Sequence, residues 1–193
     1  MPYLACCCLI LLRKLINLRP YRFFIVIFAN IYPSIAILRA HILPFCEVIY
    51  VDIRPLNQDI EGFVFKQGSI LNLPFDDNSI PSLSCLHVIE HIGLGRYGDP
   101  VEPDGYLQAA RELVRVLQPG GIMLLGIPVG KERLCFDAHR IFDPQTVVKI
   151  FQPLVLEELR FIDDNGNMCS QDTTFQEAQE FRYGCGLFLF YKI

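Results

Sequence analysis

The sequence has a low content of charged residues, and this excludes several classes of protein. Charged residues make up 20% of the 193 residues, the net charge is −4, and apolar residues make up 52%. A chain of this composition is neither disordered nor of low complexity, and its acidic balance disfavours binding of nucleic acid through bulk positive charge. The length suits a single domain with one sizeable core.

The sequence also lacks a metal-binding or redox motif. Its eight cysteines include no C-x-x-C pair, so the paired-cysteine and paired-histidine pattern of a zinc site is absent. Most of the cysteines lie among apolar residues, where a free cysteine behaves as a small buried hydrophobic side chain. We therefore predict no metal site, no disulfide framework, and a reducing, cytoplasmic compartment.

Acidic residues are absent from the first part of the chain. Residues 1–46 contain five basic residues and no acid, whereas residues 47–193 contain 12 basic and 21 acidic residues. The two parts therefore differ in character. We divide the chain into an atypical apolar and basic segment at 1–22 and a domain at 23–193, of which 47–193 has the clearer pattern.

The apolar runs near the start of the chain do not match a targeting or spanning segment. The run Tyr3–Leu12 is followed, rather than preceded, by basic residues, which is the wrong order for a secretory signal peptide. The run Phe23–Leu38 is interrupted by Asn30 and Pro33 and is shorter than the roughly 20 residues that span a bilayer. Membrane association through residues 1–38 is the alternative to a cytoplasmic protein.

Short β-branched runs alternate with longer segments, which predicts an α/β domain with a mostly parallel sheet. Apolar residues at three- and four-residue spacing predict a helix over 105–117, and a helix is also expected over 35–43. Two late runs are expected to pair antiparallel at one end of the sheet. The predicted parallel strands are 22–28, 48–52, 62–65, 82–87 and 122–127, and the antiparallel pair is 154–162 with 186–192.

Five segments in this order resemble the class I S-adenosylmethionine-dependent methyltransferases. They are VIYVDIRP (48–55), GSILNLPFDDNS (68–79), LHVIEHIGLGRYGDP (86–100), ELVRVLQPGGIMLLGIP (112–128) and YGCGLFLFYKI (183–193). The sequence is most similar to an uncharacterised methyltransferase-like branch in which EHIGLGRYGDP and a later AHRIF are shared. The resemblance covers about 47–193. It implies a Rossmann-like sheet, S-adenosylmethionine as cofactor and a small-molecule or sugar-like methyl acceptor, with no nucleic-acid partner.

The cofactor is expected at the carboxyl ends of the strands, where open parallel sheets bind ligands. Asp52 ends the second strand, where an acid can accept hydrogen bonds from both ribose hydroxyls; the alternative is a surface acid that caps a turn. The resemblance places the segment 68–70 at the adenine ring, whereas without it these residues are a simple turn. The cofactor-binding residues implied are Asp52, Ile53, Gly68, Ser69, Ile70 and His87.

The resemblance places His87, Glu90 and His91 beside the sulfonium end of the cofactor. Methyl transfer is an in-line displacement, so a base is needed only when the acceptor carries a proton that must leave. His91 or His139 is the expected base, with Glu90 as the third catalytic candidate. The alternative is that Glu90 and His91 cap and brace a turn.

Three further residues are candidates for contacts with the acceptor. Arg96 and Tyr97 lie in the glycine-rich stretch 93–98, whose composition suits a shaped loop over a pocket. Arg140 follows the fifth strand, and its planar guanidinium suits a carboxylate or a phosphate. A solvated surface charge is the alternative for the loop arginine.

The glycine-rich turn of the family is missing. Counting back from Asp52 places it near Ile31, Pro33 and Ile35, and places the acid that ends the first strand near Ala29. A positive φ is costly for isoleucine and inaccessible to proline, so we expect a degenerate first strand and helix and poor cofactor affinity. Three explanations follow: an inactive methyltransferase-like binding or scaffold domain, a rebuilt site, or an altered coding sequence upstream of about residue 46.

Overall fold

The computed structural model describes residues 23–28, 43–44, 46–57, 59–95, 101–135 and 138–193, and the backbone alone of 23–28. The predicted helix over 35–43 and the segment 1–22 fall almost wholly outside these residues. The division of the chain into 1–22 and 23–193 therefore stays a prediction. No helix within the described ranges is long and apolar enough to cross a membrane.

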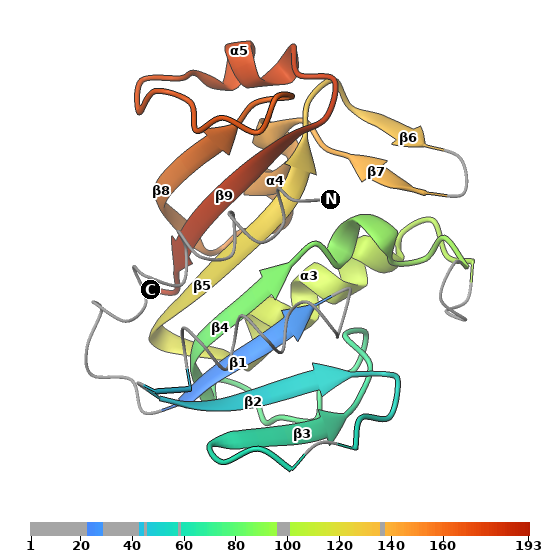
Figure 1. The fold of residues 1–193 in the computed structure, drawn as a ribbon, viewed down its shortest axis with the longest axis vertical. Coiled ribbons are helices and arrows are strands. Elements are labelled where there is room, and N and C mark those ends of the chain that lie inside the picture. Colours follow the sequence, from blue (N-terminus) through green and yellow to red (C-terminus); the bar gives the residue numbers. More distant parts are fainter. Residues whose placement is uncertain (1–22, 29–42, 45, 58, 96–100, 136–137) are drawn as a thin grey trace.

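A seven-stranded sheet forms the centre of the molecule (Figure 1). Its order is β3-β2-β1-β4-β5-β9-β8; the pairs among the first five are parallel, and β9 pairs antiparallel with both β5 and β8. The strands are β1 (Phe23–Phe28), β2 (Glu47–Asp52), β3 (Phe63–Gln67), β4 (Ile80–Leu86), β5 (Leu117–Val129), β8 (Val155–Ile162) and β9 (Gly184–Tyr191). The predicted Rossmann-like sheet with an antiparallel carboxyl-terminal pair is confirmed.

The fifth strand begins earlier than the sequence pattern indicates. The expected strand starts at Ile122 after a Pro-Gly-Gly turn, but Leu117 already pairs with Ile80 of β4. The two glycines are held by the end of the chain: the Gly120 amide donates to the Lys192 carbonyl at 2.8 Å, and the Lys192 amide donates to the Gly121 carbonyl at 3.0 Å. This pairing extends the strand backwards through the glycines.

Four short helical elements and one hairpin complete the described fold. Helix α3 (Gly105–Val116) agrees with the prediction and buries Ala109, Ala110, Leu113 and Val116. Helix α5 (Phe175–Gln179) lies in the polar stretch 163–182, where the sequence has no strong pattern of apolar residues at helical spacing. A capping box between Thr174 and Glu177 forms its start. The other elements are the 3-10 helix η1 (Ile89–His91), α4 (Pro144–Ile150), and the hairpin of β6 (Arg133–Cys135) and β7 (His139–Ile141).

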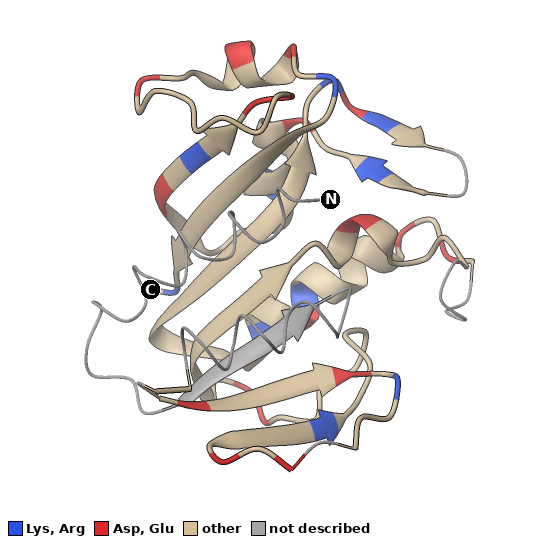
Figure 2. Ribbon diagram, in the orientation of Figure 1, with Lys and Arg blue, Asp and Glu red and all other residues tan. Residues whose placement is uncertain are grey.

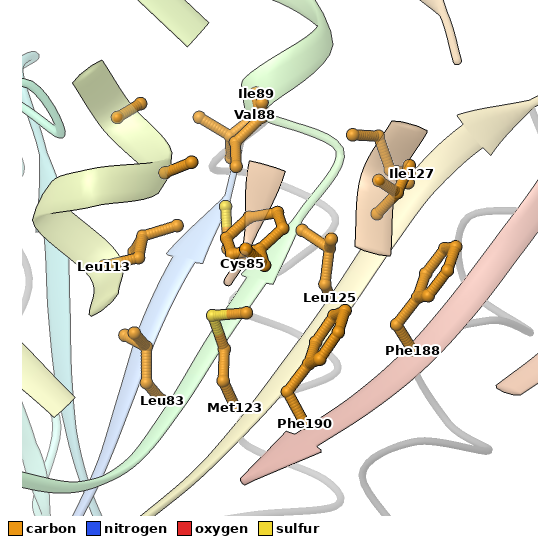
Figure 3. Packing of buried hydrophobic residues seen from close by; sticks show 14 of the residues in the cluster. Leu83, Cys85, Val88, Ile89, Leu113, Met123, Leu125, Ile127, Phe188 and Phe190 are labelled. Atoms are coloured by element: carbon orange, nitrogen blue, oxygen red, sulfur yellow. The ribbon is translucent and has the colours of Figure 1, made fainter. Parts of the chain in front are cut away.

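The core lies between the sheet and helix α3. Alternate residues of the central strands point to the same face, so Cys85 of β4, Leu125 of β5 and Phe190 of β9 belong to one buried cluster with Leu113 of α3 (Figure 3). Strands β4, β5 and β9 carry no charged residue (Figure 2). The intervening residues of these strands, such as Leu124, are also buried, as expected for a sheet buried on both faces.

Arg115 near the end of α3 holds the segment that joins β3 to β4. Its guanidinium donates to the carbonyls of Leu73 at 3.1 Å and Phe75 at 2.9 Å, and it pairs with Glu112 at 2.8 Å and Asp77 at 2.7 Å. The hydrogen bond from Arg115 is the main reason that the pKa of Glu112 is lowered. The Arg115 side chain therefore holds several residues of the segment between β3 and β4 in place.

We predict that Arg115→Ala lowers the free energy of unfolding by about 1–2 kcal/mol, because two carbonyls and two carboxylates lose their donor. Urea denaturation measures this, with Arg111→Ala on the exposed face of the same helix as control. The stabilisation from Glu112 is complete above its unfolded pKa and is lost as the pH falls through its lowered folded pKa. The difference between wild type and Arg115→Ala should therefore shrink in acid; a constant difference would contradict this account.

Candidate functional site

The candidate site lies at the carboxyl edge of the parallel strands. The chain order reverses between β1 and its neighbour β4, and this topological switch point is where open α/β sheets bind ligands. Among the described residues, the two buried charged side chains are Asp52 and Glu90, which are 7% and 1% exposed. Asp52 ends β2 and Glu90 follows β4, so both stand at this edge.

The carboxylate of Asp52 is held by Arg54. Its Oδ1 accepts from the backbone amide of Arg54 at 2.8 Å and from Nε at 3.0 Å, while Oδ2 accepts from Nη2 at 2.8 Å. The Asp52 side chain is 4% exposed and the Arg54 side chain is 43% exposed. Asp52 therefore both caps a turn and sits at the predicted ligand edge, and a carboxylate with about four acceptor sites has capacity beyond these three bonds.

Tyr50 is a neighbour of Asp52 that the sequence patterns did not single out. Its side chain is fully buried. Burial raises the pKa of Tyr50, and the charge of Asp52 raises it further. Tyr50 lies two residues before Asp52 on the same strand, so both side chains point to the same face. This spacing could have indicated from the sequence that Tyr50 is a neighbour of Asp52.

The segment after β3 is tightly folded. The Gly68 amide donates to the Asp52 carbonyl at 3.0 Å, and an added Cβ at Gly68 would lie 3.0 Å from Pro74 Cδ. The Ser69 hydroxyl accepts from the Leu71 amide at 3.2 Å. Ile70 is 6% exposed and belongs to the core, whereas Ile53 is 43% exposed. Ile53 is therefore the more open apolar surface beside Asp52.

Glu90 lies between two histidines after β4. Its Oε1 is 3.1 Å from His87 Nδ1 and 3.9 Å from His91 Nε2. The second carboxylate oxygen, Oε2, is buried and has no hydrogen-bond partner in the described structure. His87 has a φ of +54°, which is costly for any residue with a Cβ. A buried orphan oxygen and a strained backbone in one place are typical of a functional site.

The two candidate bases are brought together. His91 Nδ1 lies 2.8 Å from the Ala138 carbonyl, which can only accept, so Nδ1 carries the hydrogen and Nε2 is the basic atom of the neutral ring. The His139 ring packs edge-on against His91 at 6.1 Å between centroids and lies 4.9 Å from the Tyr183 ring. Burial, and then the charge of Glu90, raise the pKa of Tyr183 to about 12.

Tyr183 and Cys185 were not singled out as site residues. Cys185 Sγ lies 3.6 Å from His87 Nε2, although 98 residues separate them. Tyr183 comes immediately before β9, and Cys185 is the second residue of this strand, which runs antiparallel to β5. An antiparallel strand begins at the edge where the parallel strands end. The predicted antiparallel pair of strands could therefore have indicated that Tyr183 and Cys185 lie at the candidate site.

Arg140 binds the chain's own carbonyls. Its Nη1 donates to the Ile92 carbonyl at 2.6 Å and its Nη2 to the Pro103 carbonyl at 3.0 Å, and its guanidinium lies 4.8 Å from the centre of the Tyr106 ring. Arg140 thus supports both ends of the segment 93–102. Its predicted contact with an anionic acceptor stays a prediction.

Several predicted residues lie outside the described structure. These are the loop candidates Arg96 and Tyr97, and the positions Ala29, Ile31, Pro33 and Ile35 of the missing glycine turn. Within the described residues, no group of three histidine, cysteine or acidic side chains is placed to hold a metal ion.

Comparisons with known proteins agree with this fold. Residues 61–173 match a family described as "Caenorhabditis protein of unknown function, DUF268". Over 112 residues, the chain is 30% identical to an uncharacterized protein of Methanocaldococcus jannaschii, covering 54% of this chain and 43% of that protein. The chain therefore spans less than half the length of this relative.

Two solved structures have the same fold. A candidate methyltransferase of Bacillus halodurans C-125 has a TM-score of 0.64 at 18% identity over 95% of this chain and 98% of that one. The 1,6-didemethyltoxoflavin-N1-methyltransferase of Burkholderia thailandensis, solved with S-adenosylhomocysteine and 1,6-didemethyltoxoflavin, has a TM-score of 0.63 at 12% identity over 99% and 79%. The resemblance to class I S-adenosylmethionine-dependent methyltransferases is thereby confirmed for the fold.

Proposed function

Because the chain belongs to the DUF268 family and has the class I methyltransferase fold, we propose that it transfers a methyl group from S-adenosylmethionine to a small-molecule or sugar-like acceptor. The observation that carries this proposal is the pair of buried carboxylates, Asp52 and Glu90, on either side of the switch point. A buried charge is costly, so two at the ligand-binding edge favour a role in binding and chemistry.

The residues around Asp52 fit a nucleoside. Asp52 offers a carboxylate to the ribose hydroxyls when the exposed Arg54 side chain turns into solvent, and the open side chain of Ile53 offers an apolar surface beside it. We assign Gly68 to a close backbone approach, since an added Cβ would already crowd Pro74. Ser69, Ile70 and His87 complete the proposed cofactor set.

S-adenosylmethionine, when bound, supplies the methyl group from its sulfonium sulfur. The chain then has to orient the acceptor and remove its proton. His91 is the better placed base, because the Ala138 carbonyl fixes its Nδ1 hydrogen and leaves Nε2 to take the proton. Glu90, 3.9 Å from that Nε2, stabilises the resulting imidazolium. His139 is the second candidate base.

The acceptor side of the proposal rests on fewer observations. Arg96 and Tyr97 are assigned to acceptor contacts by sequence alone, and Arg140 supports the segment that carries them. We propose a small-molecule acceptor, no nucleic-acid partner and a cytoplasmic location.

Asp52→Ala tests the cofactor site. We expect the affinity for S-adenosylhomocysteine to fall about 5- to 150-fold, because hydrogen bonds worth about 1–3 kcal/mol are lost. Titration calorimetry measures this. Asp76→Ala removes an equal charge from an exposed position before β4 and should leave the affinity unchanged. Equal affinities of the two folded variants would remove Asp52 from the site.

The sequence also favours a second candidate function. Ile31, Pro33 and Ile35 stand where the family has its glycine-rich turn. An inactive methyltransferase-like binding or scaffold domain, with membrane association through its amino-terminal part, is consistent with that substitution. This candidate predicts that the folded chain does not bind S-adenosylhomocysteine, so the same titration distinguishes the two functions.

A further inference from the structure

Cys185, His87 and Glu90 form a continuous line of polar contacts at the carboxyl edge of the sheet. Cys185 pairs with Pro128 across β5 and β9, and the His87 amide donates to the Gly126 carbonyl of β5 at 2.8 Å. Strand β5 therefore aligns the start of β9 with the end of β4. This topology brings together groups that are distant in sequence.

The hydrogen-bond pattern fixes the roles of the three side chains. A carboxylate can only accept, so His87 Nδ1 carries the hydrogen that it shares with Glu90 Oε1 at 3.1 Å. In the neutral ring, His87 Nε2 then has the lone pair, and it faces Cys185 Sγ at 3.6 Å. The thiol is thus placed to donate its proton to an imidazole that a buried carboxylate orients.

We propose that these three residues form a thiol–imidazole–carboxylate triad in which Cys185 is a covalent modification site for small uncharged carbon electrophiles. In the step, the thiol proton passes to His87 Nε2, the sulfur forms a bond to carbon, and the leaving group departs from that carbon with its electron pair. Nothing is oxidised or reduced. The arrangement is that of an activated nucleophile, its base and the group that orients the base.

The unpartnered Oε2 of Glu90 is an independent sign that this cluster is built for a ligand or for charge. The Glu90 residue is 1% exposed, and that oxygen has no partner in the described part of the chain. An unpaired buried carboxylate oxygen costs free energy in a core, whereas a developing imidazolium at His87 gains from its charge.

Burial limits which electrophiles reach the thiol. Cys185 is 8% exposed, and the His87 side chain is 12% exposed. We therefore expect small uncharged reagents to reach the thiol more readily than bulky or charged ones. The residues paired with Cys185 on the flanking strands, Pro128 and Ile162, do not titrate, and the titratable groups near the thiol within the described residues include His87, Glu90 and Tyr183.

Other cysteines of the chain provide internal references. Burial raises the pKa of the thiols of Cys46, Cys85 and Cys169, as is usual for inert structural cysteines. Cys169 is half-buried, and the charges of Asp163 and Glu177 raise its pKa further. It is therefore a suitable slow reference for Cys185 within one sample.

The test is the rate of alkylation by iodoacetamide on the full chain, read for each cysteine by peptide mass spectrometry from pH 5.5 to 9.5. At about pH 6.5 we expect Cys185 to react about tenfold or more faster than Cys169, because thiolate formation is favoured beside an imidazole. His87→Asn should abolish this excess, and Asn tolerates the positive φ of this position. Glu90→Gln should reduce it, and Cys169→Ser should leave the Cys185 rate unchanged.

Equal rates for Cys185 and Cys169 in the wild type, or an unchanged Cys185 rate in folded His87→Asn, would overturn the proposal. Circular dichroism shows that each variant is folded, and an unchanged Cys169 rate shows it again for His87→Asn and Glu90→Gln. The readout needs no methyl donor, so its outcome is independent of the proposed methyltransferase function.

Discussion

Gly93→Ala is expected to lower the free energy of unfolding by about 3 kcal/mol or more. Gly93 has a φ of +77°, and a Cβ placed there would lie 1.9 Å from the Glu102 carbonyl oxygen. The left-handed backbone alone costs a non-glycine residue about 1–2 kcal/mol, and the contact with backbone atoms has no flexible side chain to relieve it. The Glu102 amide also donates to the Gly93 carbonyl at 3.0 Å, so the clash breaks a hydrogen-bonded closure.

Gly120→Ala is the matched control for this prediction. Gly120 has a φ of +75°, but no atom of the described residues lies within 4 Å of an added Cβ. Gly120→Ala should therefore lower the free energy of unfolding only by the cost of the left-handed backbone, about 1–2 kcal/mol. Chemical denaturation of both variants measures the difference, which reports the close approach of Glu102 alone. Equal denaturation midpoints would show that the segment 93–102 is not packed as described.

His91→Ala is expected to reduce turnover about 100-fold or more while leaving the affinity for S-adenosylhomocysteine within about twofold. The reason is that His91 Nε2 is the proposed proton acceptor, whereas Asp52 and Ile53 are the proposed nucleoside contacts. Release of S-adenosylhomocysteine from S-adenosylmethionine with a panel of amines, phenols and sugars measures turnover. Calorimetry measures the affinity.

His139→Ala is the informative companion to His91→Ala. The His139 ring is 6.1 Å from that of His91, but it stands next to Tyr183 rather than Glu90. A smaller loss of turnover is expected for this variant. A larger loss would reassign the base to His139, and a parallel loss of turnover and affinity in His91→Ala would indicate a structural role.

Much of the fold follows from local patterns in the sequence. The strand at 48–52 was predictable because it is a short β-branched run, and the helix at 105–117 because its apolar residues recur at three- and four-residue spacing. The antiparallel end of the sheet was predictable because two β-forming runs, now β8 and β9, are separated by the polar stretch 163–182. Each inference needed only nearby residues.

The remaining features depend on contacts between distant residues. The β6–β7 hairpin consists of two three-residue strands, which have too few residues for a periodic pattern. The line from Cys185 to Glu90 depends on the order of strands in the sheet. The hydrogen bonds from the Arg140 guanidinium to the carbonyls of Ile92 and Pro103 likewise join distant residues, and no residue pattern reveals them.

Asp52 illustrates both what the sequence predicts and what it does not. Its place at the end of β2 followed from the sequence, and its burial at the ligand edge agrees with the expected ribose contact. Its pairing with Arg54, two residues later, was not expected. The ion pair satisfies the buried carboxylate, and under the proposed function the ribose hydroxyls of the cofactor would have to replace Arg54 on it.

The central claim is that the carboxyl edge beside Asp52 and Glu90 binds S-adenosylmethionine. Titration calorimetry of the folded 193-residue chain with S-adenosylhomocysteine tests it most directly. The account predicts one site with an affinity no better than micromolar, because the positions expected for the family's glycine turn, near Ile31, Pro33 and Ile35, hold no glycine. No binding by a chain that circular dichroism shows to be folded would contradict it, and would leave a methyltransferase-like scaffold as the function.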